Sequence, residues 1–255
     1  MSNLLSTVAT TAAVLAAVAM PMAAMAQPAG ARNVVLVHGA WADGSGWRAV
    51  YDALVAEGYT VTIVQNPLTS LADDVAAADR VLDRQTGPTV LVGHSYGGAV
   101  ITEAGDHANV AALVYVAAFV PDAGESTFGL LAGGEPPPIE VSADGFAFFQ
   151  RDAFIAAFAS GLDPVLAAFL ADVQIPISVE QAGQAPLSVA AWHDKPTWYV
   201  LATDDHIIPP DAQRQMATRA GATIVEDAGA GHIRFVVDPT VVVQAVIAAA
   251  ATVTP

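Results

Sequence analysis

The stretch LVGHSYGG, residues 91–98, contains a serine between two glycines in the pattern G-x-S-x-G. The apolar run TVLVGHS (89–95) ends at this serine as a strand would, and YGGAVITEAGDHA (96–108) is typical of a helix that opens directly afterwards. A serine between a strand and a helix lies on a sharp turn and projects from the edge of a sheet. The stretch therefore predicts that Ser95 is a nucleophile on a strand–turn–helix unit.

Strand-like and helix-like segments alternate on both sides of this unit. The expected strands cover residues 33–39, 59–66, 89–95, 110–120, 196–205 and 222–227, and the expected helices cover residues 46–58, 70–85, 96–108, 209–221 and 239–253. Such alternation predicts an α/β fold, with a mostly parallel six-stranded sheet and helices on both of its faces.

Residues 121–190 interrupt this alternation with a segment rich in Pro, Gly and Phe. Within it, residues 146–173 are unusually apolar, and we expect them to be helical. We expect the segment to be a helical cap insertion over the carboxyl edge of the sheet, where α/β folds bind ligands. Its phenylalanines either cap a pocket or only pack a helical pair. Trp41 and Trp192 are candidates for the pocket wall, although either could equally belong to the core.

A serine hydroxyl needs a base, and the chain has six histidines. His232, in GAGHIRF, follows the last expected strand in a glycine-flanked loop, at the same sheet edge as Ser95. His94 adjoins the serine, but we expect it to point elsewhere and to pack as a structural residue. Asp204 and Asp205, in YVLATDDHIIPP, follow the preceding strand, and either could orient the histidine. The residues thus predict a Ser-His-Asp triad whose acid is one of these two aspartates.

Acyl transfer by a serine also needs N–H groups that stabilise an oxyanion. One donor is expected from the backbone of Tyr96, directly after the nucleophile. A second is expected from the backbone of Ala40 in HGAWADGSGW, because Gly39 lets that loop approach Ser95 closely.

Composition restricts the classes of partner. The 255 residues are 54% hydrophobic and 13% charged, so the chain can bury a large core. The 25 acidic and 9 basic residues give a net charge of -16, which disfavours nucleic acid and anionic membranes as partners. The chain has no cysteine, which excludes disulfides, thiolate catalysis and cysteine metal sites.

Residues 1–26 contain no charged side chain and end in the small-residue site AMA (24–26). They are typical of a secretory signal peptide, which predicts a secreted or periplasmic protein. The alternative is a retained membrane anchor, but Pro21 interrupts the apolar run and the cleavage site follows at once. The mature chain would be one domain, residues 27–255. We expect no stable membrane insertion, because no later apolar run reaches the ~20 residues of a spanning helix.

Four motifs together resemble the α/β-hydrolase superfamily. They are VVLVHGAWADGSGW (34–47), VLVGHSYGG (90–98), DDHIIPP (204–210) and GAGH (229–232). Within the superfamily they most resemble the small plant-type branch of methylesterases and hydroxynitrile lyases, and that branch's bacterial esterase relatives. The resemblance implies an α/β-hydrolase fold for the mature chain apart from the insertion. It also implies that the acid is Asp205, with Asp204 as the alternative, and that Ala40 and Tyr96 are the oxyanion donors.

The resemblance implies a reaction as well. Hydroxynitrile lyases of this type carry a lysine after the catalytic histidine and a threonine in the H-G pair, whereas this chain has Ile233 and Gly39. Both departures favour ester hydrolysis, and Ser95 argues against relatives that use an aspartate nucleophile. We expect hydrolysis of small to medium neutral carboxylic esters through an acyl-enzyme, with no metal or organic cofactor. The alternatives are a lyase or a cofactor-free oxygenase on the same scaffold, or a non-catalytic receptor for a small ligand.

Overall fold

Six parallel strands form the centre of the fold. The computed structural model describes residues 30–131 and 137–253. The strands of the sheet are β1 (Asn33–Val37), β2 (Thr60–Val64), β3 (Thr89–His94), β4 (Val110–Val116), β8 (Thr197–Ala202) and β9 (Thr223–Asp227). They lie in the order β2-β1-β3-β4-β8-β9, and every neighbouring pair is parallel. The prediction of a mostly parallel six-stranded sheet is confirmed.

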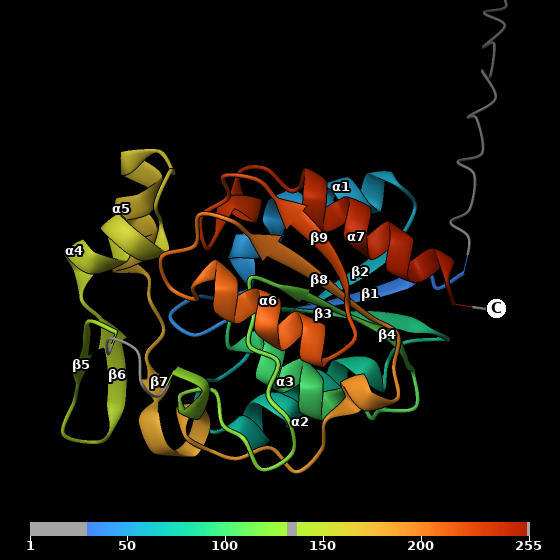
Figure 1. The fold of residues 1–255 in the computed structure, drawn as a ribbon, viewed down its shortest axis with the longest axis horizontal. Helices are drawn as coiled ribbons and strands as arrows, with labels where there is room; N and C mark the ends of the chain where they lie inside the picture. The colour runs from blue at the N-terminus through green and yellow to red at the C-terminus, as the bar shows by residue number, and fades with distance from the viewer. Residues whose placement is uncertain (1–29, 132–136, 254–255) are drawn as a thin grey trace, which may run out of the picture.

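Helices cover both faces of this sheet, as predicted. Figure 1 shows α1 (Arg48–Ala56) and α7 (Thr240–Ala251) on one face, and α2 (Leu71–Leu82), α3 (Gly97–Ala104) and α6 (Pro210–Arg219) on the other. Short 3-10 turns lie at Gly44–Trp47, Gly129–Leu131, Ala191–His193 and Arg234–Val236. Ser70 caps the start of α2, because its hydroxyl accepts a 3.0 Å hydrogen bond from the N–H of Asp73.

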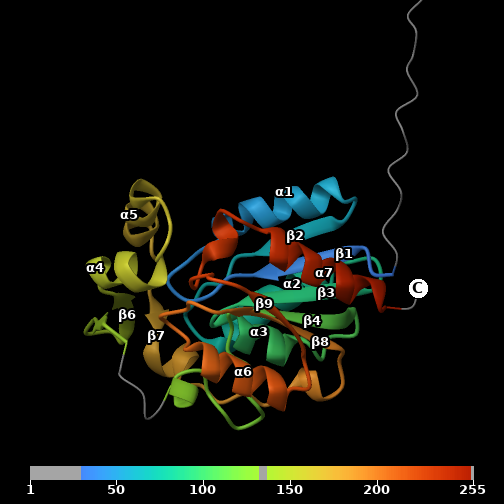
Figure 2. The same ribbon diagram turned by 45° about the horizontal axis from the view of Figure 1, so that its top comes forward.

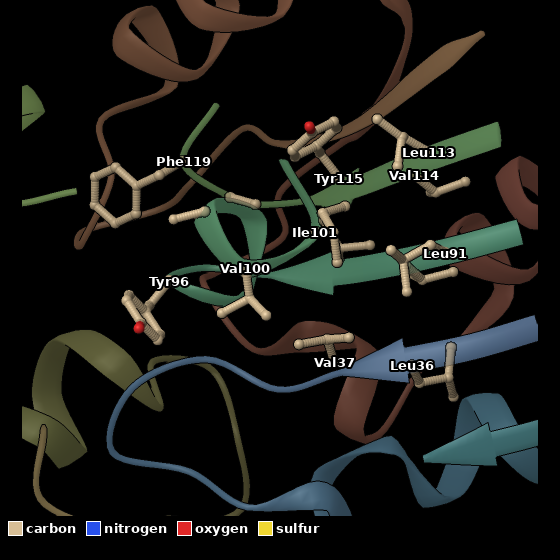
Figure 3. Packing of buried hydrophobic residues seen from close by; sticks show 14 of the residues in the cluster. Leu36, Val37, Leu91, Tyr96, Val100, Ile101, Leu113, Val114, Tyr115 and Phe119 are labelled. Carbon is tan, nitrogen blue, oxygen red and sulfur yellow. The ribbon is translucent and has the colours of Figure 1, made fainter. Parts of the chain in front are cut away.

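The central strands are buried on both faces. Every residue of β1 and β3 is buried, as a parallel sheet between two layers of helices requires. In Figure 3, Ile101 of α3 lies between Leu91 of β3 and Tyr115 of β4. This packing holds α3, and with it the turn that carries Ser95, against the sheet.

The inserted region, residues 121–190, places a small sheet and helices beyond the carboxyl ends of the main strands (Figure 1, Figure 2). It contains an antiparallel sheet of β5 (Ile139–Val141), β6 (Phe146–Phe149) and β7 (Ile177–Ser178). Its helical elements are α4 (Arg151–Ala153), α5 (Pro164–Asp172) and two π-helical turns, Phe154–Phe158 and Val179–Gly183. A 2.9 Å hydrogen bond from the N–H of Ser178 to the carbonyl of Leu68 joins this region to the loop between β2 and α2.

The helical prediction for residues 146–173 is wrong at its start. The segment opens with strand β6, in which Ala147 is buried and Phe148 is 42% exposed, the alternation of a strand with one covered face. The rest of the segment is not one continuous helix. The carboxylate of Asp163 accepts hydrogen bonds from two N–H groups of α5, so α5 begins there as a separate helix. Periodicity alone does not separate a short apolar strand from a buried helix.

None of the helices within residues 30–131 and 137–253 is long and apolar enough to cross a membrane. The predicted signal peptide, residues 1–26, lies outside the described residues.

Candidate active site

Ser95 lies on the tight turn between β3 and α3. Its φ of +53° is in the left-handed region, which costs a residue other than glycine about 1–2 kcal/mol. The turn is held on two sides, because the Ser95 carbonyl accepts hydrogen bonds from the N–H of Gly98 at 2.9 Å and of Phe119 at 3.1 Å. The start of α3 and the chain after β4 therefore maintain a strained conformation at the carboxyl end of the strand.

This turn and the loop after β1 pack backbone against backbone. A Cβ atom at Gly97 would lie 2.7 Å from two carbonyl oxygens of the β1 strand and its loop, and a Cβ at Gly39 would lie 2.8 Å from Cβ of Ser95. Larger residues do not fit at either position without displacing the backbone. The loop that carries Ala40 consequently lies beside the turn of Ser95, and Ala40 and Tyr96 line the same pocket as Ser95.

Ser95, His232 and Asp205 form a continuous chain of hydrogen bonds. Oγ of Ser95 lies 3.0 Å from Nε2 of His232, and Nδ1 of His232 lies 2.8 Å from Oδ2 of Asp205. All three residues are buried. A carboxylate only accepts hydrogen bonds, so Nδ1 carries the imidazole proton and Nε2 accepts from the serine hydroxyl. This arrangement can remove the hydroxyl proton of Ser95 as its oxygen attacks an electrophile.

Three further hydrogen bonds fix the carboxylate of Asp205. Its Oδ1 accepts from the N–H groups of Ile207 at 2.7 Å and Ile208 at 3.0 Å, and its Oδ2 also accepts from Nε2 of Gln213 at 2.8 Å. Gln213 is a fully buried residue of α6. Sequence reasoning missed it, because no local pattern relates a glutamine on this helix to the aspartate eight positions earlier.

The structure distinguishes the two aspartates that the residues alone left open. Asp205 is buried and contacts His232. The side chain of Asp204 is 64% exposed, and its Oδ1 lies 3.7 Å from Nε2 of His206. Asp205 rather than Asp204 therefore occupies the position next to the histidine.

His94 packs behind His232. Its Nε2 lies 3.1 Å from the carbonyl oxygen of His232, and the two ring centroids are 4.7 Å apart. Burial, followed by the neighbouring His232, holds the pKa of His94 well below its usual 6.5. The neutral ring donates its Nε2–H to the His232 carbonyl, as befits the structural role expected for it.

A buried carboxyl group anchors the side chain of Tyr96. The Tyr96 hydroxyl donates a 2.7 Å hydrogen bond to Oδ2 of Asp74, whose Oδ1 accepts from the N–H of Leu68 at 2.8 Å. Burial raises the pKa of Asp74 to about 6, although both hydrogen bonds favour the ionised form. A carboxyl group with a pKa of about 6 thus holds the side chain of the residue that follows Ser95.

Ser95 lines a pocket of about 290 Å³. The other lining residues come from the loops after β1, β4 and β8, from the turn itself and from the inserted region; they are Ala40, Trp41, Tyr96, Phe119, Thr127, Phe128, Leu131, Pro137, Pro138, Phe149, Ala157, His206 and Ile207. Within the described part of the chain, no Asp, Glu, Lys or Arg lines it. The walls therefore suit a neutral, largely apolar ligand.

The two tryptophans expected at the pocket wall have different positions. Trp41 lines the pocket, and its Nε1 donates a 2.9 Å hydrogen bond to the carbonyl of Ala147 in β6. Trp192 does not line it: its Nε1 donates to the carbonyl of Pro121 at 2.9 Å, and its ring packs on His193. Of the two alternatives left open for Trp192, the structure favours the core, because the residue is buried in the hydrophobic cluster and its indole N–H donates to the start of the inserted region.

Known proteins resemble this chain in sequence. The model of the alpha/beta hydrolase family matches residues 34–245. A carbendazim hydrolyzing esterase from Nocardioides sp. (strain SG-4G) is 36% identical over 135 residues, which are 48% of this chain and 55% of that protein. The alignment thus spans about half the length of that relative. A pyrethroid hydrolase from Sphingobium wenxiniae is 26% identical over 246 residues, covering 84% of this chain and 86% of that protein.

The likeness extends to solved structures. A methylesterase from Arabidopsis matches with a TM-score of 0.68 and 19% identity, covering 84% of this chain and 96% of its own. At that identity the match concerns the fold, and it agrees with the resemblance to plant methylesterases that the motifs carry. Since the family model covers most of the sequence, including all six strands apart from Asn33, the chain belongs to the alpha/beta hydrolase family.

Proposed function

We propose that the protein is a serine hydrolase that cleaves carboxylic esters of small to medium neutral substrates. The observation that carries the proposal is the hydrogen-bonded chain of Ser95, His232 and Asp205, whose Ser95 lines a pocket with no Asp, Glu, Lys or Arg among its described wall residues. The names of two relatives, a carbendazim hydrolyzing esterase and a pyrethroid hydrolase, support hydrolytic chemistry at this site.

The first half of the reaction is acylation of Ser95. His232 takes the hydroxyl proton as Oγ attacks the ester carbonyl, while Asp205 keeps the imidazole in the accepting tautomer. The backbone N–H groups of Ala40 and Tyr96 stabilise the negative charge on the carbonyl oxygen, each by ~3 kcal/mol. The imidazolium then gives its proton to the departing alcohol, and the acyl group remains on Ser95.

The second half is hydrolysis of this acyl-enzyme. A water molecule takes the place of the alcohol, and His232 removes its proton as its oxygen attacks the acyl carbonyl. The bond to Ser95 Oγ then breaks, the serine recovers the proton from His232, and the carboxylic acid leaves.

The inserted region acts as the cap of this site. It contributes the pocket residues Thr127, Phe128, Leu131, Pro137, Pro138, Phe149 and Ala157. The rings of Phe158 and His232 also pack in a T-shaped pair, with 4.7 Å between their centroids. These contacts favour a cap over a region that packs only for stability. An anionic substrate would lose its hydration in this apolar site without gaining a charged partner, which costs several kcal/mol.

Residues 1–26 act as a cleaved signal peptide, and the mature hydrolase domain, residues 27–255, is secreted or periplasmic. The support is the uncharged apolar sequence before the AMA site. Expression of the full chain in a bacterial host, followed by N-terminal sequencing of the exported protein, tests this. We expect the first residue to be Gln27, and an uncleaved N-terminus would contradict it.

Hydrolysis of p-nitrophenyl butyrate by the purified protein tests the function itself. Turnover should be lost in Ser95→Ala and retained in Ser188→Ala, which changes an exposed serine outside the pocket lining. Equal activity in both variants would reject the proposal, as would the absence of turnover in the wild-type protein.

A further inference from the structure

A second cavity adjoins the pocket of Ser95. It has a volume of about 40 Å³ and a largely apolar wall, which comes from the loop after β1, the chain after His232 and the inserted region. Its described lining includes Trp47, Phe154, Phe158, Leu170 and Phe235. Of the described residues, Trp41 alone lines both this second cavity and the pocket of Ser95. Trp41 is therefore a wall that the two spaces share.

The indole of Trp41 packs against one aromatic ring from each space. Phe149, on the wall of the Ser95 pocket, meets it edge to face with 5.2 Å between the ring centroids. Phe158, on the wall of the second cavity, meets it in the same way at 6.2 Å. Phe149 and Phe158 also contact each other, with their centroids 5.9 Å apart. The three rings thus form one aromatic cluster at the boundary of the two spaces.

Trp41 is fixed in place by its surroundings. Its φ of +57° is in the left-handed region, which a bulky residue keeps only where the structure around it imposes that conformation. Its Nε1 donates a 2.9 Å hydrogen bond to the carbonyl of Ala147 in β6, and only 6% of the residue is exposed. It also directly follows Ala40, the expected oxyanion donor, so we expect one group of an ester bound at Ser95 to end against the indole.

We propose that Trp41 is a specificity-determining residue that closes the second cavity to the substrate and thereby limits the length of the ester. This inference rests on the proposed ester hydrolysis at Ser95. In the wild-type protein, the acyl or alcohol group that packs on the indole stops there, so short esters are preferred. A smaller side chain at position 41 joins the two spaces, and the second cavity then takes the apolar end of a longer chain.

The chain offers a close match for the control variant. Trp192 is also buried, and its Nε1 also donates a 2.9 Å hydrogen bond to a backbone carbonyl, that of Pro121. Trp192 lines neither the pocket of Ser95 nor the second cavity. Trp41→Leu and Trp192→Leu therefore remove comparable indoles, but only the first removes the shared wall.

Two pairs of esters measure the selectivity of the purified protein. One pair is p-nitrophenyl octanoate and butanoate, which differ in the acyl group, and the other is hexyl and ethyl butanoate, which differ in the alcohol. The measured quantity is the ratio of kcat/KM for the long ester to that for the short ester. We expect Trp41→Leu to raise this ratio about tenfold in at least one pair, the factor expected when about two more methylene groups are buried. Trp192→Leu should keep the wild-type ratio.

A further substitution tests where the longer chain lies. Leu170 of α5 lines the second cavity but not the pocket of Ser95. Leu170→Phe should therefore refill that cavity in the Trp41→Leu background and return the ratio to its wild-type value. If circular dichroism shows that Trp41→Leu does not fold, Trp41→Phe takes its place, with an expected rise of a few-fold because its ring is smaller.

Three results would overturn the inference and leave the proposed function intact. They are an unchanged ratio in both pairs, an equal rise in Trp192→Leu, and a raised ratio that Leu170→Phe does not reverse. Failure of the wild-type protein to hydrolyse any of the esters would instead overturn the proposed function, and this inference with it.

Discussion

Gln213 braces the carboxylate of Asp205 from α6. Its Nε2 lies 2.8 Å from Oδ2 of Asp205 and 2.7 Å from the carbonyl oxygen of Ile208, and its Oε1 accepts a 3.1 Å hydrogen bond from the N–H of Ala202. One buried amide thus connects the end of β8, the following loop and the carboxylate that contacts His232.

Replacing this amide should impair both stability and turnover. Gln213→Met keeps the length of the side chain but leaves buried polar groups unpaired, so we expect the free energy of unfolding to fall by about 1–3 kcal/mol. Because Asp205 contacts His232 and does not line the pocket, we expect kcat to fall about tenfold with little change in KM. Urea unfolding and steady-state kinetics measure the two effects. Gln215→Met, at an exposed position of the same helix, is the control, and equal effects of both variants would contradict this role.

The two adjacent aspartates should differ greatly in their effect on activity. Asp205→Asn replaces an acceptor of four hydrogen bonds by an amide, which no longer fixes the accepting tautomer of His232. We expect kcat to fall by about 10⁴-fold, against a change of only a few-fold for Asp204→Asn. Kinetics with p-nitrophenyl butyrate compares the variants. A larger loss in Asp204→Asn would show that the acid has been assigned to the wrong residue.

Asp74 should make stability depend on pH. Its pKa in the folded protein is about 6, above its ordinary 3.8, so between these values the folded state keeps a proton that the unfolded state has lost. The contribution of this group to the free energy of unfolding is therefore full below about pH 4 and decreases by about 2–3 kcal/mol as the pH rises through 6. Asp74→Asn removes the titration and keeps the size of the side chain.

Urea unfolding of the wild-type protein and Asp74→Asn at pH 4, 5, 6 and 7 measures this contribution. The free energy of unfolding of the wild-type protein minus that of Asp74→Asn should decrease by about 2–3 kcal/mol as the pH rises. A difference that stays constant or increases would contradict the raised pKa of Asp74.

The meeting of Ser95, His232 and Asp205 at one place could be anticipated from the order of the strands. Each follows a predicted parallel strand, and parallel strands end at the same edge of a sheet. The choice between Asp204 and Asp205 needed the structure or a family resemblance. This choice depends on the N–H groups of Ile207 and Ile208, which bind the carboxylate of Asp205 and hold it inside the protein.

Other features of the site have no local signal in the sequence. Gln213 and Asp74 matter through partners that only the folded chain brings to them. The sequence left Trp192 open between pocket wall and core, because a lone tryptophan indicates burial but not the direction of its side chain. Strand β6 was predicted as helix for a similar reason, since four apolar residues fit both periods.

The size and charge of the pocket should limit the substrates. Its volume of about 290 Å³ is small for a ligand site, where ~300–1,000 Å³ is common. We expect kcat/KM to be higher for p-nitrophenyl acetate and butyrate than for palmitate. Between esters that differ only by a carboxylate, the neutral one should be favoured by about 100-fold or more. Faster turnover of the palmitate, or of the anionic ester, would contradict the assignment of this pocket as the substrate site.

Covalent labelling of Ser95 tests the central claim most directly. An alkyl fluorophosphonate, incubated with the purified protein and followed by intact-mass and peptide mass spectrometry, reports which residue is the activated nucleophile. We predict one adduct per chain, located on Ser95, with parallel loss of esterase activity and no adduct in Ser95→Ala. An adduct on another residue, or esterase activity that survives in Ser95→Ala, would contradict the assignment of Ser95 as the nucleophile.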